Sequence, residues 1–322
     1  MQNLYIHIGT HKTATTWLQH YLGKNSDKLN DHGFYYPWIG RITQAQHRLG
    51  QAIFARPNPH EALDNLPLWQ KFRHELAMTG YKNIVISSEE FEWVKHPELI
   101  KRFLPDVTIH TVLYLRRQDD YLESLYGQQI RDFRPRLTCT IHEYLAQRNL
   151  NFLDYSRLVA RWQAASDQMT LRIFDRKLMK GGDIGHDFLD ALGIGNTGGF
   201  EEPTAAVIDH KASLDLRAQE FVRQCNTLPL DEGVHNQLVD KIVRLNKIVP
   251  KSKARLLSVD ERRKLMSQYE SSNRKIARDY PSASPLPELF APIADGAPTI
   301  AQSDTPDPFE TLLKVNNLLQ LV

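Results

Sequence analysis

The sequence predicts an α/β protein of three layers, in which helices cover both faces of a central parallel sheet of about four to five strands. Three observations predict it. Short apolar runs rich in β-branched and aromatic residues alternate with helical patterns in the first part of the chain. With 322 residues and 41% hydrophobic content, the chain can build a substantial core. Beyond about residue 205 the strand signal fades, so the last part is expected to be helical.

Four segments read as short buried strands, because each is an apolar run of the kind that parallel sheets bury on both faces: 4–8, 84–86, 109–115 and 171–174. Helical patterns separate them at 15–22, 66–76, 119–132 and 183–192. Strands that alternate with helices imply βαβ units, whose ligands bind outside the carboxyl ends of the strands. A functional site is therefore expected in the loops that follow the strands.

Residues 1–280 are expected to form one α/β domain, with amphipathic helices at 213–225, 233–245 and 259–278 in its helical part. From Pro281 to Pro308 the sequence has seven of the chain's 17 prolines and no stable period, which predicts an extended surface segment. The closing segment 309–322 is periodic enough for a short helix. Residues 281–322 are thus expected to form a proline-rich tail that ends in a helix.

The charges of the chain nearly balance, with 40 Lys and Arg against 38 Asp and Glu. No global field therefore attracts nucleic acid or an anionic membrane surface, and any anion site must be local. Cys139 and Cys225 are too few for a disulfide framework and favour a reducing compartment. Because the sequence shows neither a signal peptide nor a run of about 18 apolar residues, it predicts a cytoplasmic protein without a membrane span. A homo-oligomer remains open.

The turn after the first predicted strand has the composition of an anion site. Its sequence, GTHKTATT from Gly9 onward, leads into a helix whose N-terminus leaves backbone N–H groups unpaired and favours negative charge. Lys12 adds a point cation, and the hydroxyls of Thr13, Thr15 and Thr16 add donors. The nucleoside-triphosphate loop G-x-x-x-x-G-K-[ST] does not fit, because Lys12 follows Gly9 by only three positions. The structural alternative is a capped helix beside a solvated lysine.

The segment KTATTW, from Lys12 to Trp17, resembles the 5′-phosphosulfate loop of the PAPS-dependent sulfotransferases, which reads K-[TS]-G-T-T-W or similar just after the first strand. Ala14 stands where the family has glycine, and its methyl group costs about 1 kcal/mol if the position needs a positive φ. The resemblance implies a P-loop-like fold that binds PAPS (3′-phosphoadenosine 5′-phosphosulfate) through His11, Lys12, Thr13, Ala14, Thr15, Thr16 and Trp17.

A second segment, TVLYLRRQDDYLESLYGQQ, resembles the part of the family that binds the 3′-phosphate of the donor. The family uses an arginine at the end of a later strand and a serine eight residues on, and here these are Arg116 and Ser124. An arginine offers a planar fork to a phosphate, and a serine in the next helix can bond the same group. Arg117 is the alternative to Arg116, since a shift of one residue exchanges them. Surface arginines before an ordinary helix are the structural alternative.

The resemblance covers roughly residues 1–280 and implies an enzyme that transfers a sulfuryl group from PAPS to a hydroxyl or an amine, releasing PAP. Lys12, the loop N–H groups and the threonine hydroxyls would neutralise the charge that develops on the leaving group. No metal is implied, and no His, Cys, Asp and Glu cluster in the sequence has metal-ligand spacing. His11 would shape the site or donate to it, and Trp17 would stack on the adenine or belong to the core.

An acceptor hydroxyl needs a general base, which the family draws from the acceptor side of the cleft. Glu89, directly after the second predicted strand, is the first candidate, and its alternative role is to start a helix. His47 is the second candidate, with a structural or surface histidine as its alternative. The sequence therefore leaves the base open between these two residues.

The acceptor is expected to be a carbohydrate or another glycan-containing molecule, because the C-terminal segments resemble those of bacterial carbohydrate-type members. Aromatic residues with cationic neighbours, which suit sugar rings but also pack ordinary cores, gather in the expected acceptor wall: Phe34, Tyr35, Trp38, Phe54 and Trp69. Two other functions stay open. One is a P-loop small-molecule kinase, which magnesium dependence would reveal. The other is a noncatalytic nucleotide-binding protein, which Ala14 and the uncertain base would favour.

Overall fold

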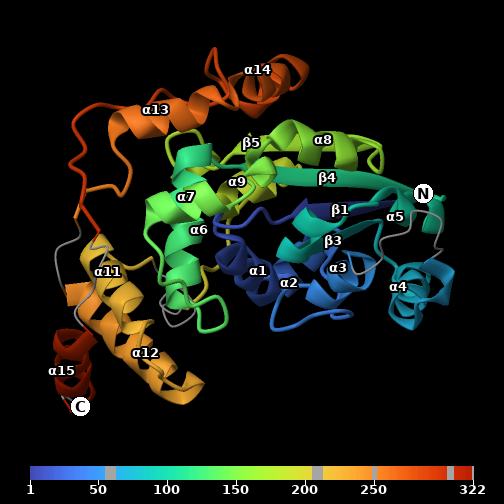
Figure 1. Ribbon diagram of the computed structural model, residues 1–322. Helices are drawn as coiled ribbons and strands as arrows, with labels where there is room; N and C mark the ends of the chain where they lie inside the picture. The colour runs from blue at the N-terminus through green and yellow to red at the C-terminus, as the bar shows by residue number, and fades with distance from the viewer. Residues whose placement is uncertain (55–62, 205–212, 249–251, 303–307, 321–322) are drawn as a thin grey trace. The chain divides into compact units, whose positions relative to one another are not determined.

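The structure is a computed structural model that describes residues 1–54, 63–204, 213–248, 252–302 and 308–320. Its centre is a five-stranded sheet in the order β2-β3-β1-β4-β5, and all neighbouring strands are parallel. The strands are β1 (Gln2–Ile8), β2 (Phe34–Tyr35), β3 (Asn83–Ser88), β4 (Val107–Leu115) and β5 (Gln168–Ile173) (Figure 1). The predicted fold class, an α/β protein with a central parallel sheet flanked by helices, is confirmed.

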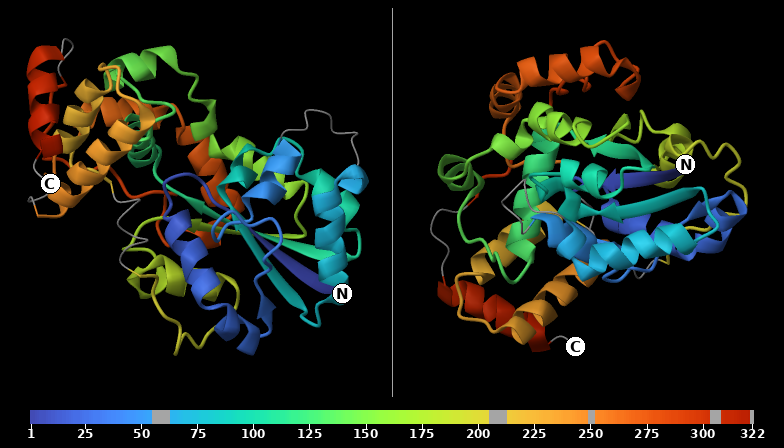
Figure 2. Two further views of the ribbon diagram at one scale, coloured as in Figure 1. Left: turned by 90° about the horizontal axis from the view of Figure 1, so that it is seen from below. Right: turned by 90° about the vertical axis from the view of Figure 1, so that its right-hand side faces the viewer.

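Helices cover both faces of the sheet. Alternate side chains of a strand point to opposite faces, so neighbouring residues of one strand contact different helices. Val112 and Tyr114 of β4 pack in one core with side chains of α1 (Thr15–Lys24), α2 (Ser26–Asp31) and α9 (Ile184–Ala191). Thr111 lies on the other face, where its hydroxyl bonds to Ser166 just after α8 (Tyr155–Gln163). Figure 1 shows α8 above β4 and α1 with α2 below it, and Figure 2 shows the same layers from two other directions.

The chain divides into two compact units. The first contains the whole sheet and consists of Met1–Arg117, Asp154–Thr204 and Glu270–Ala291. Its further helices are α3 (His47–Phe54), α4 (Pro67–Met78), α5 (Glu98–Phe103), α14 (Glu270–Asp279) and the 3-10 helices η1 (Leu63–Asn65), η2 (Glu89–Trp93), η4 (Lys180–Gly182) and η5 (Pro281–Ala283). The predicted single domain over 1–280 with a tail from 281 stays a prediction.

The second unit, Gln118–Leu153, Ala205–Tyr269 and Pro292–Val322, has a helical core. Its helices are α6 (Gln118–Arg131), α7 (Ile141–Gln147), η3 (Asn151–Leu153), α11 (Leu216–Cys225), α12 (Glu232–Ile248), α13 (Val259–Ser267) and α15 (Pro308–Gln320). Capping boxes begin two of them, with Thr140 and Glu143 at α7 and Ser258 and Glu261 at α13. The predicted terminal helix is confirmed as α15.

One expectation about elements is wrong. The predicted helix over 259–278 is two helices, α13 and α14, because Gln268 and Tyr269 donate to carbonyls three residues back, a tight turn that ends α13. Strand β2 was not predicted, since its two residues are too few to show a period. The four predicted strands are confirmed, although Phe174 lies just beyond the end of β5.

Candidate active site at the carboxyl edge of the sheet

The site lies at one edge of the sheet within the first unit. Strand β1 is flanked by β3 and β4, so the segments that follow these three parallel strands meet at the carboxyl edge. They are the loop 9–14 after β1, helix η2 after β3, and Arg116 after β4. This is where the sequence predicted a functional site.

The loop 9–14 is anchored to both neighbouring strands. The N–H of Gly9 donates to the carbonyl oxygen of Ser88 on β3, and the hydroxyl of Thr10 donates to that of Tyr114 on β4, at 3.1 and 2.6 Å. A β-carbon at Gly9 would lie 2.5 Å from the Thr15 side chain, so only glycine fits beside the start of α1. The loop is therefore held in one place against the strand ends.

Two residues of the loop have left-handed backbone conformations. Lys12 has φ 68°, and Ala14, the N-cap of α1, has φ 57° and ψ 25°. Left-handed residues near a helix start occur in nests, which turn backbone N–H groups toward an anion. The left-handed backbone of Ala14 therefore costs about 1–2 kcal/mol, because Ala14 has a β-carbon. Glycine would avoid this cost.

The threonine hydroxyls of the loop are engaged within the protein. Thr13 Oγ1 donates to the carbonyl oxygen of Thr10 at 2.7 Å, and Thr15 Oγ1 donates to Glu89 Oε1 at 2.5 Å. The protons of both hydroxyls are thus committed, and the donors that these residues offer a ligand are their backbone N–H groups. Thr16 is half-buried. Trp17 is stacked on Tyr21, with ring centroids 5.0 Å apart, and packs against the core of α1 and α9.

Arg116 meets the loop from the end of β4. Its Nη1 donates to the carbonyl oxygen of Lys12 at 2.8 Å, and Tyr155 Oη donates to the carbonyl oxygen of Arg116 at 2.6 Å. Arg117 instead donates to the carbonyl oxygen of Ala291 at 3.2 Å. Of the two arginines that the sequence left open, Arg116 is the one bonded to the loop. Ser124 lies on α6, in the second unit, and is half-buried.

Glu89 and His47, the two candidate bases, lie together at the end of β3. Glu89 accepts from Thr15 and from Gln19 Nε2 at 2.8 Å, and His47 Nε2 lies 3.7 Å from Glu89 Oε2. Burial works to raise the pKa of Glu89, but the hydrogen bonds from Gln19 and Thr15 and the charge of His47 outweigh it, so the pKa is lowered. The Glu89 side chain is therefore a carboxylate.

His47 is oriented by its neighbours on two sides. Its Nδ1 lies 2.9 Å from the hydroxyl oxygen of Ser88. The preceding residue, Gln46, exchanges hydrogen bonds with the backbone of Ser87 through its own N–H and its side-chain oxygen, both 2.9 Å long. These bonds fasten the start of α3 to the end of β3. Sequence reasoning missed Gln46, because a lone glutamine in a loop gives no signal.

The loop histidine has a partner that sequence reasoning also missed. Glu92 Oε2 accepts from the backbone N–H of His11 at 3.0 Å and lies 2.6 Å from its Nδ1. Burial works to lower the pKa of His11, but the bond to Glu92 and the charges of Glu92, Glu89 and Glu90 outweigh it, so the pKa is raised. Glu92 is one of three acids in SSEEFEW, and nothing in that run indicated which of them would face the loop.

The aromatic residues of the expected acceptor wall have different positions. Trp69 and Phe34 are buried in the core, and the hydroxyl of Tyr35 donates to Glu75 at 2.5 Å. Trp38 is 67% exposed and Phe54 is 40% exposed. The structure thus leaves two of the five aromatic side chains accessible to a ligand.

Trp38 is held in place by Arg41. The Arg41 guanidinium lies 4.2 Å from the Trp38 ring centroid and 4.3 Å from that of Tyr36. It also donates to the carbonyl oxygens of Pro37 and Tyr36. One ring face of Trp38 is therefore covered by a fixed cation, while most of the side chain is open to solvent.

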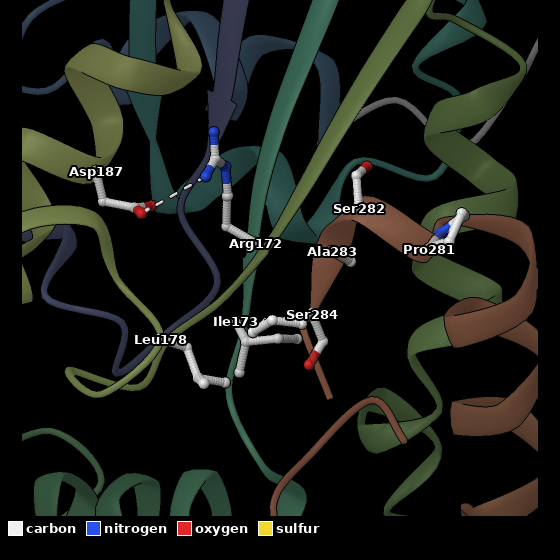
Figure 3. Close-up of a pocket in the computed structure, with 9 residues that line it drawn as sticks. Arg172, Ile173, Leu178, Asp187, Pro281, Ser282, Ala283 and Ser284 are labelled. Carbon is white, nitrogen blue, oxygen red and sulfur yellow. Dashed lines mark ion pairs between the residues drawn. The ribbon is translucent and has the colours of Figure 1, made fainter. Parts of the chain in front are cut away.

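A cavity of about 380 Å³ lies beside β5 in the same unit, lined by Arg172, Ile173, Leu178, Asp187 and residues 281–285 (Figure 3). Its charges compensate one another, since Arg172 pairs with Asp187 at 3.7 Å and with Asp190 at 2.7 Å. Buried Asp187 also accepts from the hydroxyl of Tyr114 at 2.7 Å. We assign no ligand to this cavity, which lies where η5 covers the edge strand of the sheet.

Among the described residues, no group of three or more His, Cys, Asp and Glu side chains could hold a metal ion. Within the same part of the chain, no helix is long and apolar enough to cross a membrane.

The fold and the site define an α/β protein with a five-stranded parallel sheet and a candidate site at the carboxyl edge of that sheet. No protein-family model matches the chain. An uncharacterized protein of Archaeoglobus fulgidus is 29% identical over 203 residues, 61% of this chain and 53% of that protein, so the chain spans about half the length of this curated relative. The crystal structure of a sulfotransferase from Alicyclobacillus acidocaldarius matches 65% of this chain and 89% of that chain, with 19% identity and a TM-score of 0.41. A likeness of this degree assigns no function to the chain.

Proposed function

We propose that the chain is a PAPS-dependent sulfotransferase, which transfers a sulfuryl group from PAPS to a hydroxyl or an amine and releases PAP. The observation that carries the proposal is the 2.8 Å bond from Arg116 to the carbonyl oxygen of Lys12. It joins the loop that resembles the 5′-phosphosulfate site to the residue that resembles the 3′-phosphate site. A donor with an anionic group at each end fits such an arrangement, and Ser124 is proposed as a second ligand of its 3′-phosphate.

The chemistry of the loop supports the binding of a phosphosulfate. Lys12 supplies a cation, the left-handed residues turn backbone N–H groups together, and α1 adds the positive end of its dipole. Donors fixed in this way can stabilise charge that develops on the leaving phosphate. We assign this role to Lys12 and to the N–H groups of the loop, Thr13 to Thr16, and we propose that Trp17 lies beside the adenine.

Glu89 is the proposed general base, because its lowered pKa keeps it ionised and it lies directly against the start of α1. A carboxylate within hydrogen-bond reach of an acceptor hydroxyl can take its proton as the bond from the hydroxyl oxygen to sulfur forms, because the hydroxyl becomes strongly acidic only then. His47, 3.7 Å from Glu89, is proposed to orient the carboxylate or to pass the proton on.

We propose a carbohydrate or another glycan-containing molecule as the acceptor. Exposed Trp38, backed by the guanidinium of Arg41, offers a rigid aromatic face of the kind on which the C–H face of a sugar ring stacks. The loop that carries it is fastened near His47, since the N–H of Arg48 donates to the carbonyl oxygen of Gly40 at 3.0 Å.

The test has two steps. Calorimetry should show that the protein binds PAP, and labelled PAPS should pass its label to a sugar in a panel of acceptors. Lys12→Ala should abolish the transfer, while Lys82→Ala, which changes an exposed lysine just before β3 at the opposite edge of the sheet, should leave it unchanged. The proposal fails if PAP does not bind while magnesium-ATP does. Binding of PAP with no transfer to any acceptor would leave a noncatalytic nucleotide-binding protein.

One observation favours a second candidate, a magnesium-dependent small-molecule kinase. The Thr15 hydroxyl and the Glu89 carboxylate, 2.5 Å apart after β1 and β3, are the types of group that hold magnesium in P-loop nucleotide hydrolases. Turnover of ATP that stops when magnesium is chelated would support the kinase. Transfer from PAPS that continues in the chelator would exclude it.

A further inference from the structure

The contacts of His11 within the loop have a consequence for its charge. Two groups of His11 face the same oxygen of Glu92, the backbone N–H at 3.0 Å and the ring Nδ1 at 2.6 Å. Glu92 is 3% exposed, so its carboxylate is nearly withdrawn from water, and these two donors are among the groups that stabilise it. A short bond between an imidazole and a buried carboxylate is strongest when the ring is protonated. Since Nδ1 is engaged by Glu92, the ring offers a ligand the proton on Nε2.

The surroundings of this pair are mixed in charge. Helix η2 brings Glu89, Glu90 and Glu92 toward His11, and all three favour its charged form. Lys12 follows it in the loop, and Arg161 of α8 donates to the carbonyl oxygen of Glu92 at 3.1 Å. The ring of Trp93 also lies against His11, with centroids 5.4 Å apart.

The net effect of these groups raises the pKa of His11 above its ordinary value, although burial alone would lower it. The hydrogen bond to Glu92 and the charges of the three carboxylates of η2 therefore outweigh the effect of burial on the pKa of His11. About a quarter of the His11 side chain is exposed, so a ligand of the loop can reach it.

We propose that Glu92 is a positioning residue that holds His11 as a second cationic ligand, beside Lys12, of the anion bound in the 9–14 loop. This inference rests on the proposed function and extends it. The loop then has two cations of different kinds. A lysine and a histidine differ in the pH range over which they ordinarily lose their charge, and the charge of His11 also depends on the carboxylate behind it.

The charge of His11 gives the anion affinity a pH dependence that Lys12 cannot give. Affinity for PAP should fall by about tenfold as the pH rises from 6 through the pKa of His11 toward 9, because one charge-assisted bond is lost. Glu92→Gln keeps an oxygen for the backbone N–H of His11 but removes the charge. The fall should then occur at lower pH, since the pKa of His11 returns toward its ordinary value.

The experiment pairs calorimetry of PAP binding from pH 6 to 9 with an NMR titration of the histidine ring, assigned by the loss of its signal in His11→Asn. Glu90→Gln is the matched control, because it removes a carboxylate of the same helix whose oxygen bonds to Gln51 at 3.0 Å. The inference is supported if Glu92→Gln lowers the pKa of His11 and shifts the binding profile, and Glu90→Gln changes both much less.

Two results would overturn the inference. One is a His11 titration that is the same in the wild-type protein and in Glu92→Gln. The other is a loss of affinity in Glu92→Gln that is equal at every pH, which would mean that Glu92 only shapes the loop. Failure of the wild-type protein to bind PAP at any pH would refute the proposed function and the ligand role of His11. The NMR titration would still decide whether Glu92 sets the charge of the ring.

Discussion

Ala14→Gly should stabilise the protein, because Ala14 is the N-cap of α1 and has a left-handed backbone, and glycine suits both better than alanine. Ala14 has φ 57°, in the left-handed region that costs a residue with a β-carbon about 1–2 kcal/mol. Two effects oppose the gain from removing that strain. Glycine gives the unfolded chain more freedom, which costs about 0.4–1 kcal/mol, and the half-buried methyl group loses part of the roughly 0.8 kcal/mol that a buried carbon contributes. The expected net gain is about 0.5 kcal/mol.

The matched control is Ala160→Gly in α8, an exposed position in the middle of a right-handed helix of the same unit. There the same chemical change should cost about 1 kcal/mol. Urea unfolding followed by tryptophan fluorescence suits both variants, because all five tryptophans of the chain lie in the first unit. The two variants should differ by about 1.5 kcal/mol, with opposite signs. Equal destabilisation by both would refute strain at Ala14.

Three further predictions concern the base, the acceptor and a buried histidine. Glu89→Gln should lower kcat by at least about 100-fold with PAP still bound, and an unchanged kcat would move the role of base to His47. Trp38→Ala should raise the acceptor KM and leave the PAP affinity unchanged, whereas Trp38→Phe should retain most of the acceptor affinity. Equal acceptor KM values in the wild-type protein and both variants would contradict a role of Trp38 as an aromatic platform for the acceptor. Burial lowers the pKa of His7 to about 4 despite the charge of Glu89, so His7 is neutral in the fold and protonated more readily when unfolded. As the pH falls from 6.5 to 4, the wild-type protein should therefore lose about 3 kcal/mol more stability than His7→Gln in urea titrations, and parallel losses would contradict the assignment.

The strands and the site loops could be predicted because their signals are local. Each long strand is an apolar run bounded by turns, and the loop after β1 carries its own motif from Lys12 to Trp17. The partners of the loop could not be predicted in the same way. Glu92 meets His11 across 81 residues of sequence, and only the pairing of β1 with β3 brings them together. Gln19 lies one helical turn after Thr15, but the carboxylate that both contact is 70 residues away from Gln19 in the sequence.

The backbone conformation of Ala14 is another feature that could not be predicted from the sequence. An alanine in the glycine position of the motif is compatible with a right-handed or a left-handed residue. The choice is made by the surroundings, because Gly9 packs against Thr15 and the Thr10 hydroxyl holds the loop to β4. Similarly, nothing in the row of aromatic residues from Phe34 to Trp69 distinguished core from surface, because burial depends on which helices cover them.

The position of Glu89, as the proposed general base, would give the proposed reaction cycle a timing. Its two oxygens accept one bond each, from Thr15 and from Gln19, and these bonds hold the start of α1. A protonated carboxyl group accepts hydrogen bonds less strongly than a carboxylate. Each proton transfer to Glu89 would therefore weaken its bonds to Thr15 and Gln19, which hold the start of α1 beside the loop that binds the nucleotide product. These hydrogen bonds would regain their strength when the proton leaves Glu89 for His47 or for water. A loop that relaxes only after the acceptor has been deprotonated would hold the intact donor until transfer and would release the nucleotide product only after transfer.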